Sequence, residues 1–412
     1  MAKPNGIWVE PSIVPLASSS CSLTSITTNW SSVCFSSDAL IVSTMAAIVI
    51  LDILIHHTSN MTREAILYEK RPNGKVLCTA CARYCEIGKG QIGLCGIRGN
   101  ENGKLDLYVY GKVIAGHVDP IEKKPVIHYN PGSKIFSIAT TGCNWLCKYC
   151  QNSDISQRRK VEGVDMTPEQ VANTAVEHGA DGIAYTYNEP SIFIEFARDC
   201  GVAARKKGLF NIFVSNGYDT PESVKMMDEF LDCITIDFKG SAEPDFTRKF
   251  IGVPDPQPIF DTILEIRDKT KIHTEITDLI VPQVGDSLEH ARKLAKFVYD
   301  QLGPETVIHF LRFHPDYKMM EYPATPVKTL EKHYEIAKSE GLKYVYLGNV
   351  PGHPWEHTYC AGCNEIVVKR FGFDIQEWHL DKNNKCKFCG NQIPITGSLA
   401  KDYKQERFQF VV

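Results

Sequence analysis

The sequence predicts an α/β protein whose central part is a barrel or an open sheet of parallel strands. From residue 135 to about residue 349, short β-type runs alternate with helical stretches, a pattern typical of parallel βα units. Seven such runs with intervening helices favour an α/β barrel over a doubly wound sheet. The runs span residues 135–140, 182–187, 211–216, 233–238, 271–281, 307–313 and 344–348.

Capping residues mark where the intervening helices start. Thr167 is an N-cap candidate followed by proline at the first helical position, and Gln170 stands at the capping-box position. Thr220 and Thr325 each precede a proline in the same way, and the Asp-Ser-Leu-Glu segment at 286–289 offers a further start. The sequence therefore predicts helices that begin directly after these residues.

Three cysteines follow the first β-type run in the spacing C-x3-C-x2-C. These central cysteines are Cys143, Cys147 and Cys150. Three thiolates can hold three irons of a cubane iron–sulfur cluster, and the lack of a fourth leaves one iron open for an exchangeable ligand. A zinc knuckle is disfavoured because structural zinc needs four ligands, usually from paired C-x2-C units. The alternative is three unrelated buried thiols.

This spacing, with aromatic Tyr149 before the last cysteine, resembles the radical S-adenosylmethionine (SAM) superfamily. The resemblance implies a partial (βα)6 barrel and a [4Fe–4S] cluster whose open iron chelates the amino and carboxylate groups of SAM. One electron then cleaves SAM to methionine and a 5′-deoxyadenosyl radical, which abstracts hydrogen from a substrate. It also implies an external electron donor such as ferredoxin or flavodoxin.

The ends of the second and third β-type runs carry candidates for holding SAM, since reactive groups of α/β barrels sit at strand carboxyl ends. Glu189, with the backbone near Asn188, offers oxygens to the amino group. The Glu-Pro of the Gly-Gly-Glu-Pro motif common in the superfamily is present here without its glycines. Ser215 and Asn216 would serve the ribose or the carboxylate, and Tyr149 would lie against adenine.

Later runs carry further polar residues. Asp237 and Lys239 form an Asp-x-Lys pair that resembles the same strand end in glycyl-radical-enzyme activating enzymes. This pair is expected either to contact SAM or to form a salt bridge that closes the barrel rim. Glu275 on the fifth run and His309 on the sixth are additional candidates for the carboxyl edge, each of which could equally be an ordinary loop or cap residue.

Two further cysteine sets have metal-ligand spacing. The N-terminal cysteines, in the pattern C-x2-C-x3-C-x9-C, predict a structural zinc site, with an auxiliary iron–sulfur cluster as the alternative; they are Cys78, Cys81, Cys85 and Cys95. The C-terminal cysteines form two C-x2-C knuckles that look like a zinc ribbon; they are Cys360, Cys363, Cys386 and Cys389. A ribbon usually staples a small domain, but it can also bind nucleic acid or protein.

The whole layout resembles AmmeMemoRadiSam system radical SAM enzymes, relatives of the pyruvate formate-lyase activating enzyme. The resemblance implies a protein or other macromolecular substrate and a role like that of glycyl-radical-enzyme activases. The alternative is a metal-stapled module that binds RNA or a protein partner without radical chemistry. The matching segments are residues 78–95, 141–152, 185–190, 312–318 and 348–353.

Composition and charge limit the kinds of partner and the cellular setting that the sequence allows. The net charge of −4 and the scattered basic residues give no clear nucleic-acid patch. Grouped cysteines point to a reducing, cytoplasmic setting. Residues 1–60 have an atypical composition, which predicts a disordered extension or a translation start placed too far upstream, with a membrane anchor as the disfavoured alternative. We expect an N-terminal metal-binding segment at 61–130, the barrel at 131–350 and the ribbon-like segment at 351–412.

Overall fold

The computed structural model describes residues 62–401, 403 and 409–410. The chain divides between Asn60 and Met61. The expectations for the extension at 1–60 therefore concern residues outside the described part. Among the helices of the described part, none is both long enough and apolar enough to cross a membrane.

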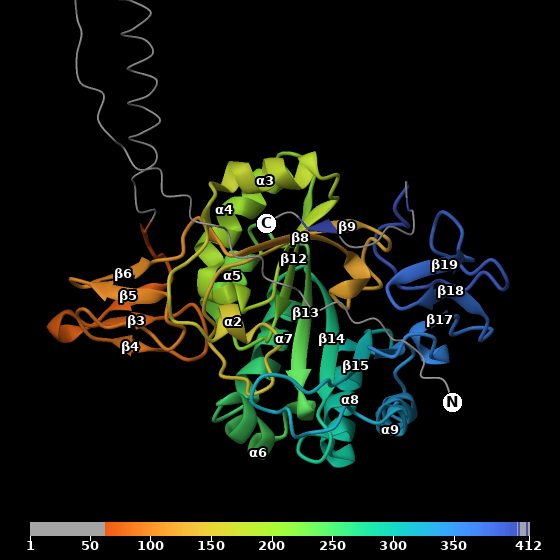
Figure 1. The fold of residues 1–412 in the computed structure, drawn as a ribbon. Coiled ribbons are helices and arrows are strands. Elements are labelled where there is room, and N and C mark those ends of the chain that lie inside the picture. Colours follow the sequence, from red (N-terminus) through yellow and green to blue (C-terminus); the bar gives the residue numbers. More distant parts are fainter. Residues whose placement is uncertain (1–61, 402, 404–408, 411–412) are drawn as a thin grey trace, which may run out of the picture. The chain divides into compact units, whose positions relative to one another are not determined.

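The described residues form a large sheet whose parallel strands follow one another in chain order, which confirms the predicted fold class (Figure 1). Two antiparallel strands extend its first edge: β8 (Ala115–Pro120) pairs with β9, and β20 (Gln409–Phe410) pairs with β8. The parallel strands are β9 (Lys134–Ala139), β11 (Gly182–Tyr185), β12 (Phe210–Ser215), β13 (Cys233–Lys239), β14 (His273–Ile280), β15 (Ile308–Arg312) and β16 (Val345–Gly348).

Helices connect these strands as βα units predict. Side chains of the sheet alternate between two faces: Phe136 and Phe213 belong to the large core that the helices share, whereas Ile135 and Ile212 pack on the other face with Ile121. The helices are α2 (Ser153–Ser156), α3 (Pro168–Glu177), α4 (Ile194–Arg205), α5 (Pro221–Met227), α6 (Pro244–Phe246), α7 (Gln257–Lys269), α8 (Leu288–Leu302) and α9 (Val327–Ser339).

A helix begins within two residues of each of the four predicted starts. Thr167 and Thr220 cap α3 and α5 through complete capping boxes, and Ser287 caps α8. At the fourth start α9 begins at Val327, but Thr325 does not cap it, because its hydroxyl donates to the carbonyl of Ile280 instead, at 2.6 Å, and α9 has no side-chain cap. A hydroxyl buried between two strands satisfies its hydrogen bonds there rather than at a helix end.

Short strands build the segments that carry the other cysteine sets. On the N-terminal side are β1 (Arg63–Glu64), β2 (Tyr68–Lys70), β3 (Val76–Cys78), β4 (Glu86–Ile87), β5 (Arg98–Glu101) and β6 (Lys104–Leu107), followed by β7 (Lys112–Val113), which pairs with β10 (Val164–Asp165). On the C-terminal side are β17 (Thr358–Tyr359), β18 (Ile366–Phe371) and β19 (Asp374–Trp378).

Glu275 and His309 do not lie at the carboxyl edge of the sheet, so their predicted position is wrong. Glu275 is the third residue of β14 and His309 the second of β15. The Glu275 carboxylate is buried and accepts hydrogen bonds from the backbone N–H of Ile127 and of His128, and it contacts His309 Nε2 at 2.9 Å. These residues therefore join the segment before β9 to the amino-terminal half of the sheet.

Candidate functional site

The loop that follows β9 carries the central cysteines, all three of which are partly exposed. It begins at Gly142, whose φ of 89° lies in the left-handed region. A Cβ at this position would lie 2.5 Å from the carbonyl oxygen of Cys95, so only glycine is accommodated. Two backbone hydrogen bonds to segment 250–251 hold the stretch between the cysteines. The backbone thus presents three thiols at the carboxyl edge of the sheet.

The loop that follows β11 is bonded directly to the cysteine loop. Asn188 Nδ2 donates to the carbonyl oxygens of Thr140 and Gly142, at 2.8 and 2.9 Å. In the other direction, Asn152 Nδ2 donates to the carbonyl oxygen of Tyr187 at 3.0 Å. Asn188 therefore positions the cysteine loop with its side-chain amide.

Glu189 brings the loops after β11 and β12 together. Its Oε1 accepts from Ser215 Oγ at 3.0 Å, and its Oε2 accepts from the backbone N–H of Asn216 at 2.7 Å. Burial and the charge of nearby Asp219 raise the pKa of Glu189 above its ordinary value, and a cationic donor beside the carboxyl group would favour its charged form. Because Oε2 accepts only one hydrogen bond within the described residues, it retains capacity for a cationic donor.

Asn216 links the loop after β12 to the loop of the central cysteines. Its Nδ2 donates to Asn144 Oδ1 at 2.8 Å, and the same oxygen lies 3.8 Å from the sulfur of Cys143. On the far side, Lys239 forms an ion pair with Asp237, whose other oxygen accepts from Thr277 Oγ1 at 2.7 Å. Of the two roles expected for Asp237 and Lys239, the structure shows the salt bridge.

Tyr149 has aromatic neighbours that the sequence did not predict. Its ring stacks on Phe246, with centroids 6.0 Å apart, and meets the edge of Phe313 at 5.9 Å. The side chain is 5% exposed, and its hydroxyl has no hydrogen-bond partner among the described residues. Burial raises the pKa of this hydroxyl, which keeps it protonated as a hydrogen-bond donor.

Several buried polar atoms around the cysteine loop have no partner within the described part of the chain. Buried polar groups are rarely left without a partner, so a cluster of them indicates a bound ligand. They comprise Thr141 Oγ1, Asn144 Nδ2, Asn188 Oδ1 and the Tyr149 hydroxyl. Together with three partly exposed thiols, this donor set fits an iron–sulfur cluster that carries a polar ligand.

The C-terminal cysteines converge on one point. All four sulfurs lie within 4.8 Å of one another. Cys360 and Cys389 are 3.6 Å apart, and Cys363 and Cys386 are 3.8 Å apart. A tetrahedral ion with metal–sulfur bonds of about 2.3 Å separates its ligands by about 3.8 Å. This site is therefore dimensioned for a single metal ion.

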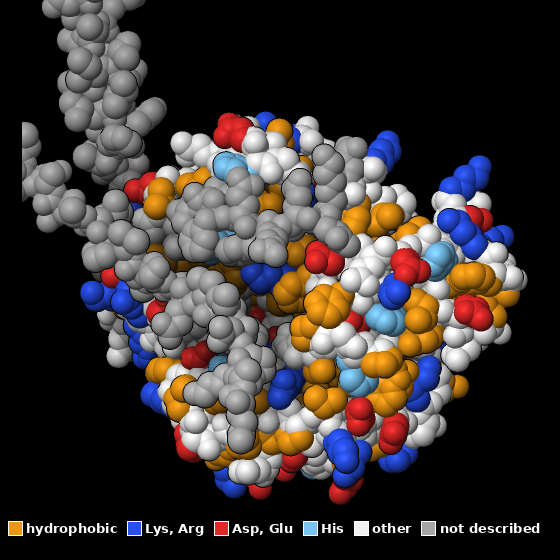
Figure 2. All heavy atoms as spheres, turned by 45° about the vertical axis from the view of Figure 1, so that its right-hand side comes forward, with side chains coloured by type: hydrophobic (Ala, Val, Ile, Leu, Met, Phe, Trp, Pro, Cys, Tyr) orange, Lys and Arg blue, Asp and Glu red, His pale blue; other side chains and the backbone are white. Residues whose placement is uncertain are grey.

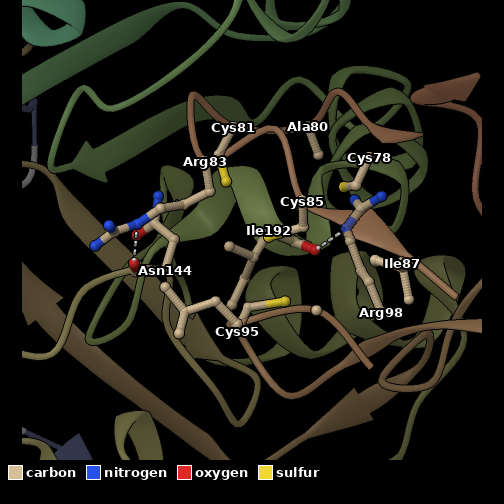
Figure 3. Close-up of a pocket in the computed structure, with 12 residues that line it drawn as sticks. Cys78, Ala80, Cys81, Arg83, Cys85, Ile87, Cys95, Arg98, Asn144 and Ile192 are labelled. Carbon is tan, nitrogen blue, oxygen red and sulfur yellow. Dashed lines mark hydrogen bonds between the residues drawn. The ribbon is translucent and has the colours of Figure 1, made fainter. Parts of the chain in front are cut away.

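The N-terminal cysteines line one cavity without converging in this way (Figure 3). Arg98 and Asn144 also line the cavity, so it adjoins the central cysteine loop. Within the described residues, the C-terminal cysteines are the single set of three or more metal-ligating side chains that closes within 4.8 Å.

Fold and site together define a class: an enzyme that carries an iron–sulfur cluster at the carboxyl edge of a parallel α/β sheet. The family model described as the radical SAM superfamily matches residues 137–298, which include the central cysteines. An uncharacterized protein of Methanocaldococcus jannaschii is 43% identical over 336 residues, 81% of this chain and 99% of that protein. The chain belongs to the radical SAM superfamily.

Two more distant relatives carry functional names. The ribosomal RNA large subunit methyltransferase Cfr of Staphylococcus aureus is 21% identical over 52% of this chain and 65% of that protein. A candidate glycyl-radical enzyme activating enzyme of Methanocaldococcus jannaschii is 22% identical over 55% of this chain and 82% of that protein.

Membership in the radical SAM superfamily determines the class of reaction. When bound, the [4Fe–4S] cluster supplies the electron that cleaves SAM and thereby yields the 5′-deoxyadenosyl radical. The chain is therefore an enzyme, and the alternative of a binding module without radical chemistry is wrong. Within the protein, the central cysteines would hold three irons of the cluster. Asn188 positions the cysteine loop, and Glu189 links the neighbouring loops.

Proposed function

We propose that this enzyme abstracts hydrogen from a protein substrate, in the manner of an activating enzyme of the AmmeMemoRadiSam group. The names of both distant relatives denote macromolecular substrates, a ribosomal RNA in one case and an enzyme in the other. Charge favours a protein over a nucleic acid. The chain carries a net charge of −4, and on the face in Figure 2 Lys and Arg side chains are interspersed with Asp and Glu.

The observation that carries the SAM-cleaving part of the proposal is the polar edge around the central cysteines. Glu189 Oε2 would accept from the SAM ammonium, and Ser215 and Asn216, positioned by the same carboxylate, would contact its ribose or carboxylate. Asp237 and Lys239 would line the opposite rim, and the Tyr149 hydroxyl would face the adenosyl part. A low-potential donor such as ferredoxin or flavodoxin would supply the electron, and the C-terminal cysteines would hold Zn²⁺.

Deuterium transfer tests the substrate class. Cells are grown in deuterated medium, and their extract is separated into protein, RNA and small-molecule fractions. Each fraction is incubated without oxygen with reduced enzyme and SAM. Abstraction moves deuterium from the substrate into 5′-deoxyadenosine, which mass spectrometry detects. We expect label from the protein fraction. Label from the filtrate or the RNA fraction alone would contradict a protein substrate.

A further inference from the structure

The N-terminal cysteines gather around one cavity. Cys78 ends β3, Cys81 and Cys85 lie in the turn to β4, and Cys95 precedes β5. All four line the same cavity, and Figure 3 shows the sulfurs of Cys78, Cys81 and Cys95 directed into it. Three of the four residues are buried and Cys85 is partly exposed. Four thiols around one cavity are a complete ligand set for a metal centre.

The spacing of the C-terminal sulfurs in the same chain can be compared with that of the N-terminal sulfurs, and the comparison indicates which kind of metal centre the N-terminal cysteines would hold. Their sulfurs close to the spacing of a single tetrahedral ion. No three of the N-terminal thiols, all of which are described, lie mutually within 4.8 Å, and the same is true of the central cysteines. A cubane cluster holds its ligand sulfurs farther apart than one ion does, because irons and sulfides lie between them. Spacing therefore groups the N-terminal set with the central one.

The cavity of the N-terminal cysteines adjoins the loop of the central cysteines. Asn144 lines the N-terminal cavity and also contacts the sulfur of Cys143. Arg83, in the turn between Cys81 and Cys85, donates from Nε to the carbonyl oxygen of Asn144 at 2.9 Å. One residue of the cysteine loop thus separates the two sets of thiols.

A buried ion pair fixes the N-terminal segment to the sheet domain. Arg98 and Glu195 form this pair with side chains that are 1% and 2% exposed, and Arg98 Nε donates to the carbonyl oxygen of Ile192 at 2.6 Å. Glu195 also accepts from the backbone N–H of Ile66 at 3.0 Å. This attachment holds the N-terminal segment against the sheet domain, beside the central cysteine loop.

We propose that the N-terminal cysteines hold a second [4Fe–4S] cluster, which relays single electrons to the cluster on the central cysteines. Four thiolates leave no iron open, so this cluster cannot chelate SAM and is suited to electron transfer. A reduced carrier protein of the flavodoxin or ferredoxin class gives it one electron. That electron then passes to the central cluster, and no bond or proton changes place. The relay role rests on the proposed SAM-cleaving function.

Metal analysis of two variants tests the cluster. In the full chain with Cys143, Cys147 and Cys150 all replaced by alanine, purified without oxygen, we expect about four irons and four sulfides to remain. The reduced protein should show a paramagnetic signal that SAM does not shift. In the variant Cys81→Ser/Cys85→Ser, the remaining signal should shift with SAM. Zinc bound in place of iron in the first variant, or no metal at the N-terminal cysteines, would overturn the proposal.

The relay is tested separately with two electron sources. Cys81→Ser/Cys85→Ser should keep SAM cleavage driven by dithionite and lose cleavage driven by reduced flavodoxin. Equal loss or equal retention with both sources would overturn the relay role. Zinc at the C-terminal cysteines reports whether the variant is folded. If wild-type enzyme failed to cleave SAM while the triple-alanine variant kept its iron, the proposed function would fail and the second cluster would stand.

Discussion

Glu189 is the residue that joins the loops of the proposed SAM-binding edge, because its carboxylate contacts both Ser215 and Asn216. We expect Glu189→Gln to weaken SAM binding about ten- to hundredfold, since a charge-assisted hydrogen bond contributes about 1.5–3 kcal/mol. Titration of the anaerobic holoenzyme with SAM measures this. Glu177→Gln, at an exposed position of α3, is the control. Unchanged affinity in Glu189→Gln would mean that Glu189 only supports the rim.

At this scale the sequence identifies residues but not all of their contacts. Glu189 could be singled out because a Glu-Pro pair follows a strand, and the central cysteines because of their spacing. Asn144 was missed, although it stands next to Cys143. Its partners, Asn216 and Arg83, come from loops 72 and 61 residues away. Contacts over such separations depend on the tertiary fold, and local sequence pattern does not carry them.

At the scale of elements, we expect part of the C-terminal knuckles to depend on a bound metal ion. Replacing Cys386 and Cys389 together with serine should release about one zinc equivalent, because a closed site needs all four thiolates. Val367 and Ile375 pack with Tyr346 of the large sheet, so strands β18 and β19 should stay protected from protease. Limited proteolysis should therefore cut the knuckle loop around residues 381–392. Iron content should persist. Lys387→Ala, exposed between the two cysteines, is the control. A parallel loss of iron and zinc would mean that the ribbon helps to close the barrel.

The amino-terminal half of β14 predicts a pH dependence of stability. Burial alone would raise the pKa of Glu275, but hydrogen bonds from His273 and His309, with their charge, hold it well below its ordinary value of 4.5. A carboxyl group whose pKa is depressed by folding stabilises the folded state above its unfolded pKa, and this contribution is lost as the pH falls. The free energy of unfolding should therefore decrease as the pH drops below about 4.5.

Urea unfolding of wild type and Glu275→Gln at a series of pH values measures this contribution. At pH 7 the variant should be less stable by about 3 kcal/mol, because a buried charged partner is removed. Its stability should depend less on pH than that of wild type in the acid range. The same acid slope in both proteins would show that other carboxyl groups determine it.

Long elements were predicted well and short ones were not. The parallel strands begin and end within two residues of the predicted runs, because buried strands are rich in apolar and β-branched residues. Strands β1 to β6 have only two to four residues each, too few for an alternating pattern to identify. Thr325 failed as a cap because its hydroxyl is used by Phe313 and Ile280 in the tertiary structure.

For the whole molecule, we expect the residues from Met61 onward to be sufficient. The sheet and all three cysteine sets lie in the described part of the chain, after the division at Asn60. A shortened protein that begins at Met61 should be soluble, bind the same iron and zinc as the full chain, and cleave SAM at the same rate. Analytical gel filtration and SAM turnover measure this. Aggregation or inactivity would show that residues 1–60 take part in the fold.

The most direct test of the central claim is SAM cleavage by the wild-type holoenzyme and by Cys147→Ala. Wild-type protein purified without oxygen should show the broad iron–sulfur absorption band and, once reduced, should produce 5′-deoxyadenosine from SAM. Cys147→Ala should keep its fold, as judged by circular dichroism, and produce none, because two thiolates do not assemble a cluster with one open iron. Formation of 5′-deoxyadenosine by Cys147→Ala at the wild-type rate would contradict the assignment of the central cysteines.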